Sequence, residues 1–241
     1  MLVWVASYPR SGNTLALLTL RDVFGIVRLG TVHRNRLGLA GLPHLPPSAA
    51  RPPYEIPPDL INLPNDTLLS ALRRRREPFF IKTHRPADAS DQAPAIYLVR
   101  DGRDALVSQA HRVHEMDKRE FRGLTFNRRL ARLIQRGTTG FGDWSRHVRA
   151  WRGRDARTAL VRFEELIVDP SVVVGAACNE IGVPLPEPSG ELTPLAIARE
   201  HNAIEFRRGE VGTWREEMPP RLHERFWLRH GEEMEALGYR R

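Results

Sequence analysis

Lysine, cysteine and long apolar runs are scarce in this sequence. These shortages bear on the source of its positive charge, on disulfide bonds and on membrane spans. Lys82 and Lys118 are the only lysines among 37 basic residues, so arginine carries nearly all of the positive charge. The single cysteine, Cys178, cannot form an internal disulfide and fits a reducing compartment, for which we expect the cytoplasm. No apolar run is long enough to span a membrane, and no basic segment precedes the apolar N-terminus as it would in a signal peptide. We therefore expect no membrane partner.

The charge balance is basic, with a formal net charge of +8. Such a balance suits a polyanionic partner, which can be a nucleic acid, a membrane surface or a phosphorylated cofactor. The strong preference for arginine over lysine is more typical of a coding bias than of a binding face. The net charge alone therefore does not distinguish among these partners, and the choice depends on local motifs.

Short apolar runs alternate with helical periodicity along the chain. An apolar fraction of 41% in 241 residues is enough for a core, and we expect one domain spanning residues 1–241. The pattern predicts an α/β fold, a three-layer P-loop-like domain whose central parallel sheet is flanked by helices. The expected strands are Leu2–Ala6, Phe79–Lys82, Ala95–Val99 and Ala159–Arg162, and the expected helices are Thr14–Phe24, Ala105–Val113, Thr125–Arg136, Asp143–Trp151 and Pro170–Ile181. Ligands of such sheets bind at the carboxyl ends of the strands.

The segment after the first expected strand has the composition of an anion-binding turn. Arg10, Ser11, Gly12 and Asn13 lie between an apolar strand and an apolar-periodic helix. This arrangement points backbone N–H groups and a helix N-terminus at an anion. It is not a Walker A loop, because the basic residue precedes the glycine and no Gly-Lys-Ser/Thr follows. The alternative is an ordinary turn, capped by Ser11 or Asn13, before a helix.

Two further polar segments follow expected strands. The run Lys82-Thr83-His84 ends the second strand, where a neutral imidazole can accept a proton at physiological pH. Arg100 ends the third strand, and Ser108 follows eight residues later on the next helix. Arginine offers a planar donor fork that suits phosphate, and serine adds a hydroxyl donor. Asp101 or Asp104 is expected to serve as the cap and first-turn charge of that helix.

Together these segments resemble the sulfotransferases that use 3′-phosphoadenosine 5′-phosphosulfate (PAPS). The first turn is similar to that family's 5′-phosphosulfate loop, with Arg10 in place of the usual Lys and Leu15 in place of the usual Trp. The Lys82-Thr83-His84 run resembles the family's catalytic segment, and Arg100 with Ser108 resembles its 3′-phosphate segment.

Three more segments carry the resemblance toward the C-terminus. Val161–Pro170 resembles a segment whose aromatic residue contacts the adenine, here Phe163. Phe206–Trp214 resembles the loop that closes on the 3′-phosphate. Gly142–Trp151 resembles a family helix, in which we interpret the tryptophans as core and His147 as structural.

The resemblance implies a role for each of these residues. His84 is the general base for an acceptor hydroxyl, and Lys82 and Arg10 stabilise charge on the leaving phosphate. PAPS is the co-substrate, adenosine 3′,5′-bisphosphate (PAP) is a product, and no metal is required. The residues implied to bind PAPS are Arg10, Ser11, Gly12, Asn13, Thr14 and Leu15 at the 5′-phosphosulfate, Arg100, Ser108, Arg207, Arg208 and Gly209 at the 3′-phosphate, and Phe163 at the adenine.

We therefore expect transfer of a sulfuryl group to a hydroxyl or amine of a small-molecule or glycan acceptor, including glycopeptides. The alternatives are a P-loop-type kinase, a pseudoenzyme that binds PAPS without turnover, and a nucleic-acid-binding protein. The last explains neither His84 nor the first turn, so we expect no nucleic-acid partner. Acceptor identity and oligomeric state stay open. The segments expected to face the acceptor are the proline-rich Pro43–Pro64 loop and the region His111–Arg136.

Overall fold

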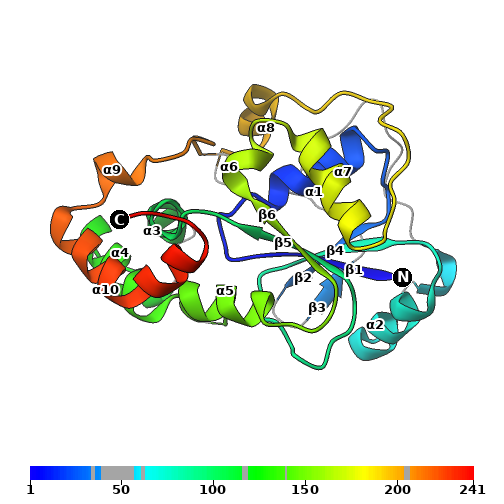
Figure 1. The fold of residues 1–241 in the computed structure, drawn as a ribbon, viewed down its shortest axis with the longest axis horizontal. Coiled ribbons are helices and arrows are strands. Elements are labelled where there is room, and N and C mark those ends of the chain that lie inside the picture. The colour runs from blue at the N-terminus through cyan, green and yellow to red at the C-terminus, as the bar shows by residue number, and fades with distance from the viewer. Residues whose placement is uncertain (34–35, 39–56, 61–62, 116–118, 139, 204–206) are drawn as a thin grey trace.

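The computed structural model describes residues 1–33, 36–38, 57–60, 63–115, 119–138, 140–203 and 207–241. Within these residues, one six-stranded sheet runs in the order β3-β2-β4-β1-β5-β6 (Figure 1). Strands β2, β4, β1, β5 and β6 are parallel, and β3 pairs antiparallel with β2 at one edge. The strands are β1 Leu2–Ser7, β2 Leu29–His33, β3 Arg36–Gly38, β4 Phe79–Thr83, β5 Ala95–Val99 and β6 Thr158–Arg162.

Helices connect most of the strands and extend the chain beyond β6. Two short 3₁₀ turns, η1 Pro58–Leu60 and η2 Arg119–Phe121, lie among them. The α-helices are α1 Asn13–Asp22, α2 Asn65–Arg74, α3 Gly102–Glu115, α4 Phe126–Arg136, α5 Trp144–Arg152, α6 Phe163–Leu166, α7 Pro170–Glu180, α8 Leu195–His201, α9 Trp214–Glu217 and α10 Pro220–Ala236.

The sheet is buried on both faces, which makes three layers. Alternate residues of a strand point to opposite faces, so Trp4 of β1 joins one apolar cluster and its neighbours Val3 and Val5 join the other. The first cluster includes side chains of α2, α3, α4, α5 and α10, and the second includes side chains of α1, α6, α7 and α8. Figure 1 shows these two sets of helices on opposite sides of the sheet. The predicted α/β architecture with a central parallel sheet is confirmed.

Each predicted strand and helix is present, and its ends either coincide with the predicted ones or differ by at most three residues. The pattern missed the edge strand β3 and its neighbour β2, the short helices α6, α8 and α9, and the long C-terminal helix α10. An edge strand such as β3 pairs on one side only and is often very short, so its apolar pattern is weak. Of the predicted Pro43–Pro64 loop, most residues lie outside the described part of the chain.

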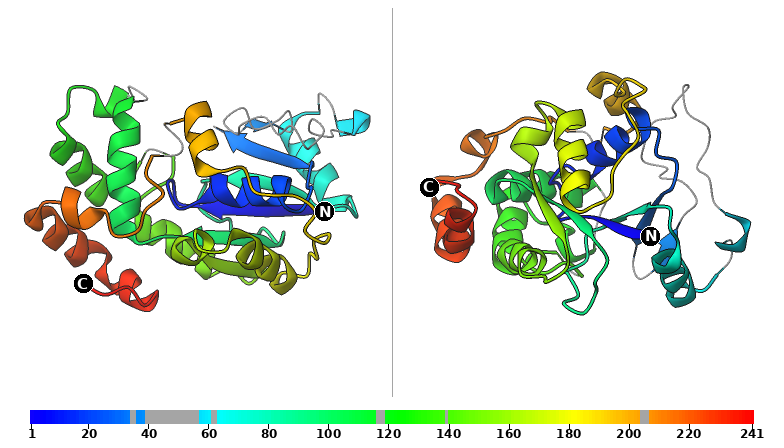
Figure 2. Two further views of the ribbon diagram at one scale, coloured as in Figure 1. Left: turned by 90° about the horizontal axis from the view of Figure 1, so that it is seen from above. Right: turned by 45° about the vertical axis from the view of Figure 1, so that its right-hand side comes forward.

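The strand order brings the polar segments together. β1 is central, with β4 on one side and β5 on the other, and Ala6 is in register with Thr83 and with Tyr97. The carboxyl ends of β1, β4 and β5 therefore lie side by side. Figure 2 shows β1 running from the N-terminus toward the side of the molecule where α3, α4, α9 and α10 gather, shown in green, orange and red. Among the described helices, none has the length and apolar character needed to cross a bilayer.

Candidate active site

The turn after β1 contains two residues in the left-handed region, Arg10 with φ 73° and Gly12 with φ 96°. Gly12 occupies the N-cap position of α1, and no side chain caps the helix. A turn capped by Ser11 or Asn13 is therefore wrong. Asn13 Nδ2 instead donates backward, to Val5 O at 2.9 Å and to Ser7 Oγ at 3.2 Å. The first N–H groups of α1 face the turn without a side-chain cap, which is what an anion-binding turn requires.

Arg10 lies against the two residues expected at the 3′-phosphate. Arg10 Nε donates to Ser108 Oγ at 3.0 Å, and the Arg100 guanidinium donates to Arg10 O at 3.1 Å. Both Arg100 and Ser108 are buried, at 6% and 4% exposure. Burial lowers the pKa of Arg100 against the raising effects of Asp104 and Glu164, but an arginine pKa this high keeps the group charged. The tertiary structure thus joins the two segments that are predicted to bind phosphate.

Several buried polar atoms in this region fit a phosphate ligand. Ser11 Oγ and Arg100 Nε are buried donor atoms with no hydrogen-bond partner among the described residues. A buried polar atom without a partner costs roughly 1–3 kcal/mol. Phosphate oxygens would accept from the hydroxyl and the guanidinium and relieve that cost. The residues present therefore fit the phosphorylated nucleotide that the sequence predicts.

Phe163, the first residue of α6, closes one side of the same region. The Arg100 guanidinium lies 4.3 Å from the centroid of its ring, a cation–π contact. A Cβ added to Gly12 would lie 2.8 Å from Phe163 Cδ2, closer than real Cβ contacts. Glycine is therefore required at position 12 both for its positive φ and for the approach of this ring.

The predicted 3′-phosphate loop at positions 207–209 is held near β5 through its backbone. The Arg100 guanidinium donates to Glu210 O at 2.7 Å. Arg207 pairs with Glu217 at 2.9 Å, and Arg208 pairs with Glu216 at 3.3 Å. Gly209 follows with φ 70°, which lets the chain turn there. Both arginines therefore already have acidic partners on α9.

Asp104 lies in the first turn of α3, where an acidic residue is predicted, and it also holds a distant segment. Its carboxylate accepts hydrogen bonds from Gly212 N at 2.7 Å, Trp214 N at 2.9 Å and Thr213 Oγ1 at 3.1 Å. It therefore also ties the segment after the predicted 3′-phosphate loop to α3. Asp101 is the cap, because its Oδ1 accepts from the Arg103 backbone N–H at 2.9 Å, the geometry of an N-cap.

His84 lies just beyond β4, at the end of the sheet where β1 and β5 also end. Its Nδ1 is 2.9 Å from Ser7 O and 3.2 Å from Ser7 Oγ. A carbonyl oxygen can only accept, so Nδ1 carries the proton and Nε2 holds the lone pair of the neutral ring. Lys82, two residues earlier on β4, is buried at 8% exposure. An imidazole with its lone pair on Nε2 is equipped to receive a proton.

Thr14 and Leu15 lie on the first turn of α1. Thr14 is half-buried, while Leu15 packs against the apolar cluster on the α1 side of the sheet. Position 15 therefore contributes to the core, and its apolar side chain has no polar group to offer a phosphate.

Sequence reasoning missed residues that hold the site together. Glu164 accepts from Asp101 N at 3.0 Å and from Tyr239 Oη at 2.9 Å, so it links the ends of β5 and β6 with the C-terminal segment. Glu217 receives hydrogen bonds from His111 Nε2 at 2.6 Å and from Arg207. Burial raises the pKa of Glu217, but these two bonds outweigh it and lower that pKa overall. A carboxylate next to a motif residue is the only signal that the sequence offered for Glu164.

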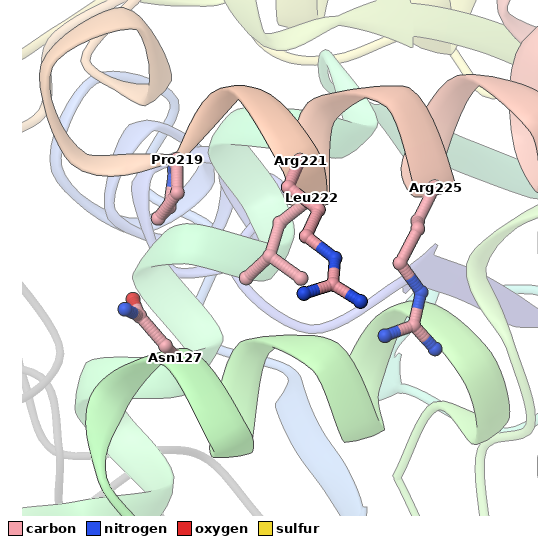
Figure 3. Close-up of a pocket in the computed structure, with 5 residues that line it drawn as sticks. All are labelled: Asn127, Pro219, Arg221, Leu222 and Arg225. Carbon is pink, nitrogen blue, oxygen red and sulfur yellow. The ribbon is translucent and has the colours of Figure 1, made fainter.

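A separate pocket lies between α4 and α10, with a volume of about 340 Å³ (Figure 3). None of the residues predicted to act at the site lines it. The residues that do line it are Asn127, Pro219, Arg221, Leu222 and Arg225. Among the described residues, no group of three or more His, Cys, Asp or Glu side chains is arranged to hold a metal ion.

Known proteins resemble this chain along most of its length. Mouse sulfotransferase 4A1 is 25% identical over 96% of this chain and 80% of its own. Cytosolic sulfotransferase 11 of Arabidopsis thaliana is 24% identical over 92% of this chain and 69% of its own. Among solved structures, mouse sulfotransferase SULT7A1 complexed with PAP has a TM-score of 0.59, at 19% identity and over 96% of this chain and 83% of its own.

Retinol dehydratase in complex with androsterone and inactive cofactor PAP has a TM-score of 0.64, at 17% identity, over 100% of this chain and 82% of its own. At these identities, the two solved structures establish the fold, and they confirm the predicted P-loop-like architecture. The sequence model of the family described as the sulfotransferase domain matches residues 2–238. This chain belongs to the sulfotransferase domain family and is a sulfotransferase.

Proposed function

We propose that this enzyme moves a sulfuryl group from PAPS to a hydroxyl of a small-molecule acceptor, with His84 as the general base. The observation that carries the proposal is the contact between His84 Nδ1 and Ser7 O, because it leaves the lone pair on Nε2. Two structural neighbours are complexes with PAP, which supports PAPS as the donor. The family model spans 2–238, which supports a single domain over residues 1–241.

Bound PAPS would supply the sulfuryl group and a phosphate leaving group. The acceptor hydroxyl gives its proton to His84 Nε2 while its oxygen bonds to sulfur. The sulfur–oxygen bond to the phosphate breaks, and the electron pair stays on that oxygen. Lys82 and Arg10 are the cations that we assign to this developing charge, since fixed charge in a buried site is usually the largest catalytic contribution.

The nucleotide is held at both ends in this proposal. The turn from Arg10 to Thr14 binds the 5′-phosphosulfate, with the N-terminus of α1 behind it. Arg100 and Ser108 bind the 3′-phosphate, joined by Arg207, Arg208 and the backbone at Gly209. Phe163 contacts the adenine. For Arg207 and Arg208, binding requires an exchange, because both arginines pair with Glu216 and Glu217.

The acceptor is proposed to be a small molecule with an apolar body. The Phe141 ring lies 5.8 Å from the His84 ring, edge to face, so an aromatic wall borders the proposed base. Curated relatives include 3-alpha-hydroxysteroid and 3-beta-hydroxysteroid sulfotransferases of Cavia porcellus, each matched over about half of this chain. An apolar alcohol or phenol fits this wall better than a sugar does.

The test uses labelled PAPS with a panel of phenols, alcohols, sugars and glycopeptides, read as label transfer and mass shift. We expect sulfation of an alcohol or phenol, unchanged by a metal chelator. His84→Ala should abolish transfer yet bind PAP as the wild type does, and exposed His201→Ala should retain both. Wild-type turnover by His84→Ala would refute the base. PAP binding with no product would indicate a pseudoenzyme, and ATP-dependent transfer lost on chelation would indicate a kinase.

A further inference from the structure

Helix α5 donates hydrogen bonds to two consecutive carbonyl groups in the turn that carries His84. His147 Nε2 is 3.1 Å from His84 O, and Trp151 Nε1 is 2.9 Å from Arg85 O. The two donors are four residues apart and therefore lie on one face of α5. The backbone at His84 is thus held from outside its own strand.

The hydrogen bonds of His147 fix its tautomer. Because the His84 carbonyl can only accept, His147 Nε2 must carry the proton, and Nδ1 must accept from the Tyr97 hydroxyl at 3.0 Å. Both His147 and Tyr97 are fully buried. The Trp151 ring stacks on Tyr97 with centroids 5.7 Å apart and planes 8° apart. A buried chain of side-chain contacts therefore connects β5, through α5, to the turn after β4.

Burial keeps the side chains of His147 and Tyr97 uncharged. Burial lowers the pKa of His147 to about 4 and raises that of Tyr97 well above its ordinary value. At neutral pH the imidazole accepts at Nδ1 and donates at Nε2, and the phenol remains a donor. His147 contacts the backbone of His84 and not its imidazole, so it can act on the reaction only through the placement of that residue.

We propose that His147 is a positioning residue for sulfuryl transfer, which holds the His84 backbone so that Nδ1 stays on Ser7 O and Nε2 faces the acceptor. This inference rests on the proposed role of His84 as base. The imidazole is anchored at its ring by Ser7 O and at its main chain by His147 Nε2. With both ends fixed, few orientations of the ring remain, and groups that orient a reacting imidazole commonly matter to activity.

The first test needs no acceptor, because it measures histidine tautomers by ¹⁵N NMR. In the wild type we expect His84 protonated at Nδ1 and His147 protonated at Nε2. His147→Phe removes the donor and should leave His84 in a mixture of tautomers. His147→Gln keeps an N–H near the position of Nε2 and should restore the Nδ1 tautomer. His84 protonated at Nε2 in the wild type, or unaffected in His147→Phe, would overturn the proposal.

The second test measures turnover with the acceptor that the panel identifies. A misplaced reacting group can cost up to about 100-fold, so we expect His147→Phe to lower kcat by roughly 10- to 100-fold. Its affinity for PAP should stay within about twofold of the wild type. In the His84→Ala background, His147→Phe should cause no further loss of whatever residual turnover a long incubation with labelled PAPS detects. Equal losses in both backgrounds would show that His147 does not act through His84.

His230 supplies a matched control. It is also fully buried, its Nε2 is 3.0 Å from Ile134 O, and its Nδ1 is 2.6 Å from Ser145 Oγ. His230→Phe should lower stability as His147→Phe does but leave kcat unchanged. A kcat loss of the same size in His230→Phe would show that the effect of His147→Phe comes from general destabilisation, which would overturn the proposal.

If His147→Phe does not fold, two milder variants keep the test decisive. Tyr97→Phe removes the hydroxyl that His147 Nδ1 accepts from, and Trp151→Phe removes the donor to Arg85 O but keeps an aromatic ring. Each should lower kcat with PAP affinity retained, and wild-type kcat in both would refute the proposal. If His84→Ala turns over as the wild type does, the base assignment fails, whereas the tautomer measurement still decides whether His147 orients the ring.

Discussion

Arg10 Nε donates a hydrogen bond of 3.0 Å to Ser108 Oγ, across 98 positions of the sequence. The bond joins the turn after β1 to α3, so the segments assigned to the two ends of the nucleotide are in direct contact. Arg10 is also held by its carbonyl, which accepts from Arg100. A cation at this position therefore contacts both of the proposed phosphate sites and not the first turn alone.

Two substitutions of Arg10 distinguish the effect of its positive charge from the effect of its planar guanidinium group. Arg10→Lys keeps the charge but loses the planar fork, so one side chain can no longer donate to Ser108 and to a phosphate in the same way. We expect PAP affinity to fall by less than about fivefold in Arg10→Lys, and by about tenfold or more in Arg10→Gln, since bonds to charged groups contribute roughly 1.5–3 kcal/mol. Titration calorimetry with PAP measures both. Equal affinities for Lys and Gln would remove charge as the reason.

Gly12→Ala should destabilise the protein and displace Phe163. The added Cβ would lie 2.8 Å from the ring, and φ 96° is unfavourable for alanine. We expect a loss of roughly 2–4 kcal/mol in the free energy of unfolding, from strain and overpacking together. Gly123→Ala is the control, because Gly123 has φ 72° with no atom within 4 Å of the added Cβ. Equal losses in the two variants, measured by urea denaturation, would mean that contact with Phe163 contributes nothing.

Arg100→Ala should discriminate between nucleotides. We expect affinity for PAP to fall about 10- to 100-fold and affinity for adenosine 5′-phosphate to change far less, because only PAP carries the 3′-phosphate assigned to this side chain. Exposed Arg76→Ala serves as the control for loss of one positive charge. A similar loss for both nucleotides would contradict the assignment and point to a structural effect through the carbonyls of Arg10 and Glu210.

Stability should fall on acidification because two histidines are buried in the neutral form. Burial lowers the pKa of His147 and of His230 to about 4, whereas an unfolded histidine has a pKa near 6.5. Between these values the unfolded chain binds more protons. The stabilisation is therefore complete above about pH 6.5 and is lost toward pH 4, by about 1.4 kcal/mol per pH unit for each histidine.

His230→Gln should lower the slope of unfolding free energy against pH by the contribution of one histidine. The slope is measured by urea denaturation at several pH values from about 7 to about 4.5. Exposed His201→Gln should leave the slope unchanged. A slope that is the same in His230→Gln and the wild type would mean that His230 titrates alike in both states.

The candidate site was largely predictable because its segments are local. The turn from Arg10 to Thr14, the run ending at His84 and the end of β5 at Arg100 each show a strand followed by polar residues. Parallel strands end at a common edge, so these residues were expected to meet. The predicted acidic start of α3 is present, with Asp101 as the cap and Asp104 in the first turn, but no local pattern indicated the distant partners of Asp104. Its carboxylate accepts from Gly212 N, 108 positions away.

By itself, the sequence determined the class of fold, the order of its main strands and helices, and the residue types at each strand end. It could do so because apolar periodicity and turn chemistry act over a few residues. Only the tertiary structure decided which side chains contact one another. Arg10 meets Ser108, and His147 holds the carbonyl of His84, because the order β4-β1-β5 and the packing of α5 bring distant segments together. Such contacts depend on the strand order and on the packing of the whole chain, which no local pattern encodes.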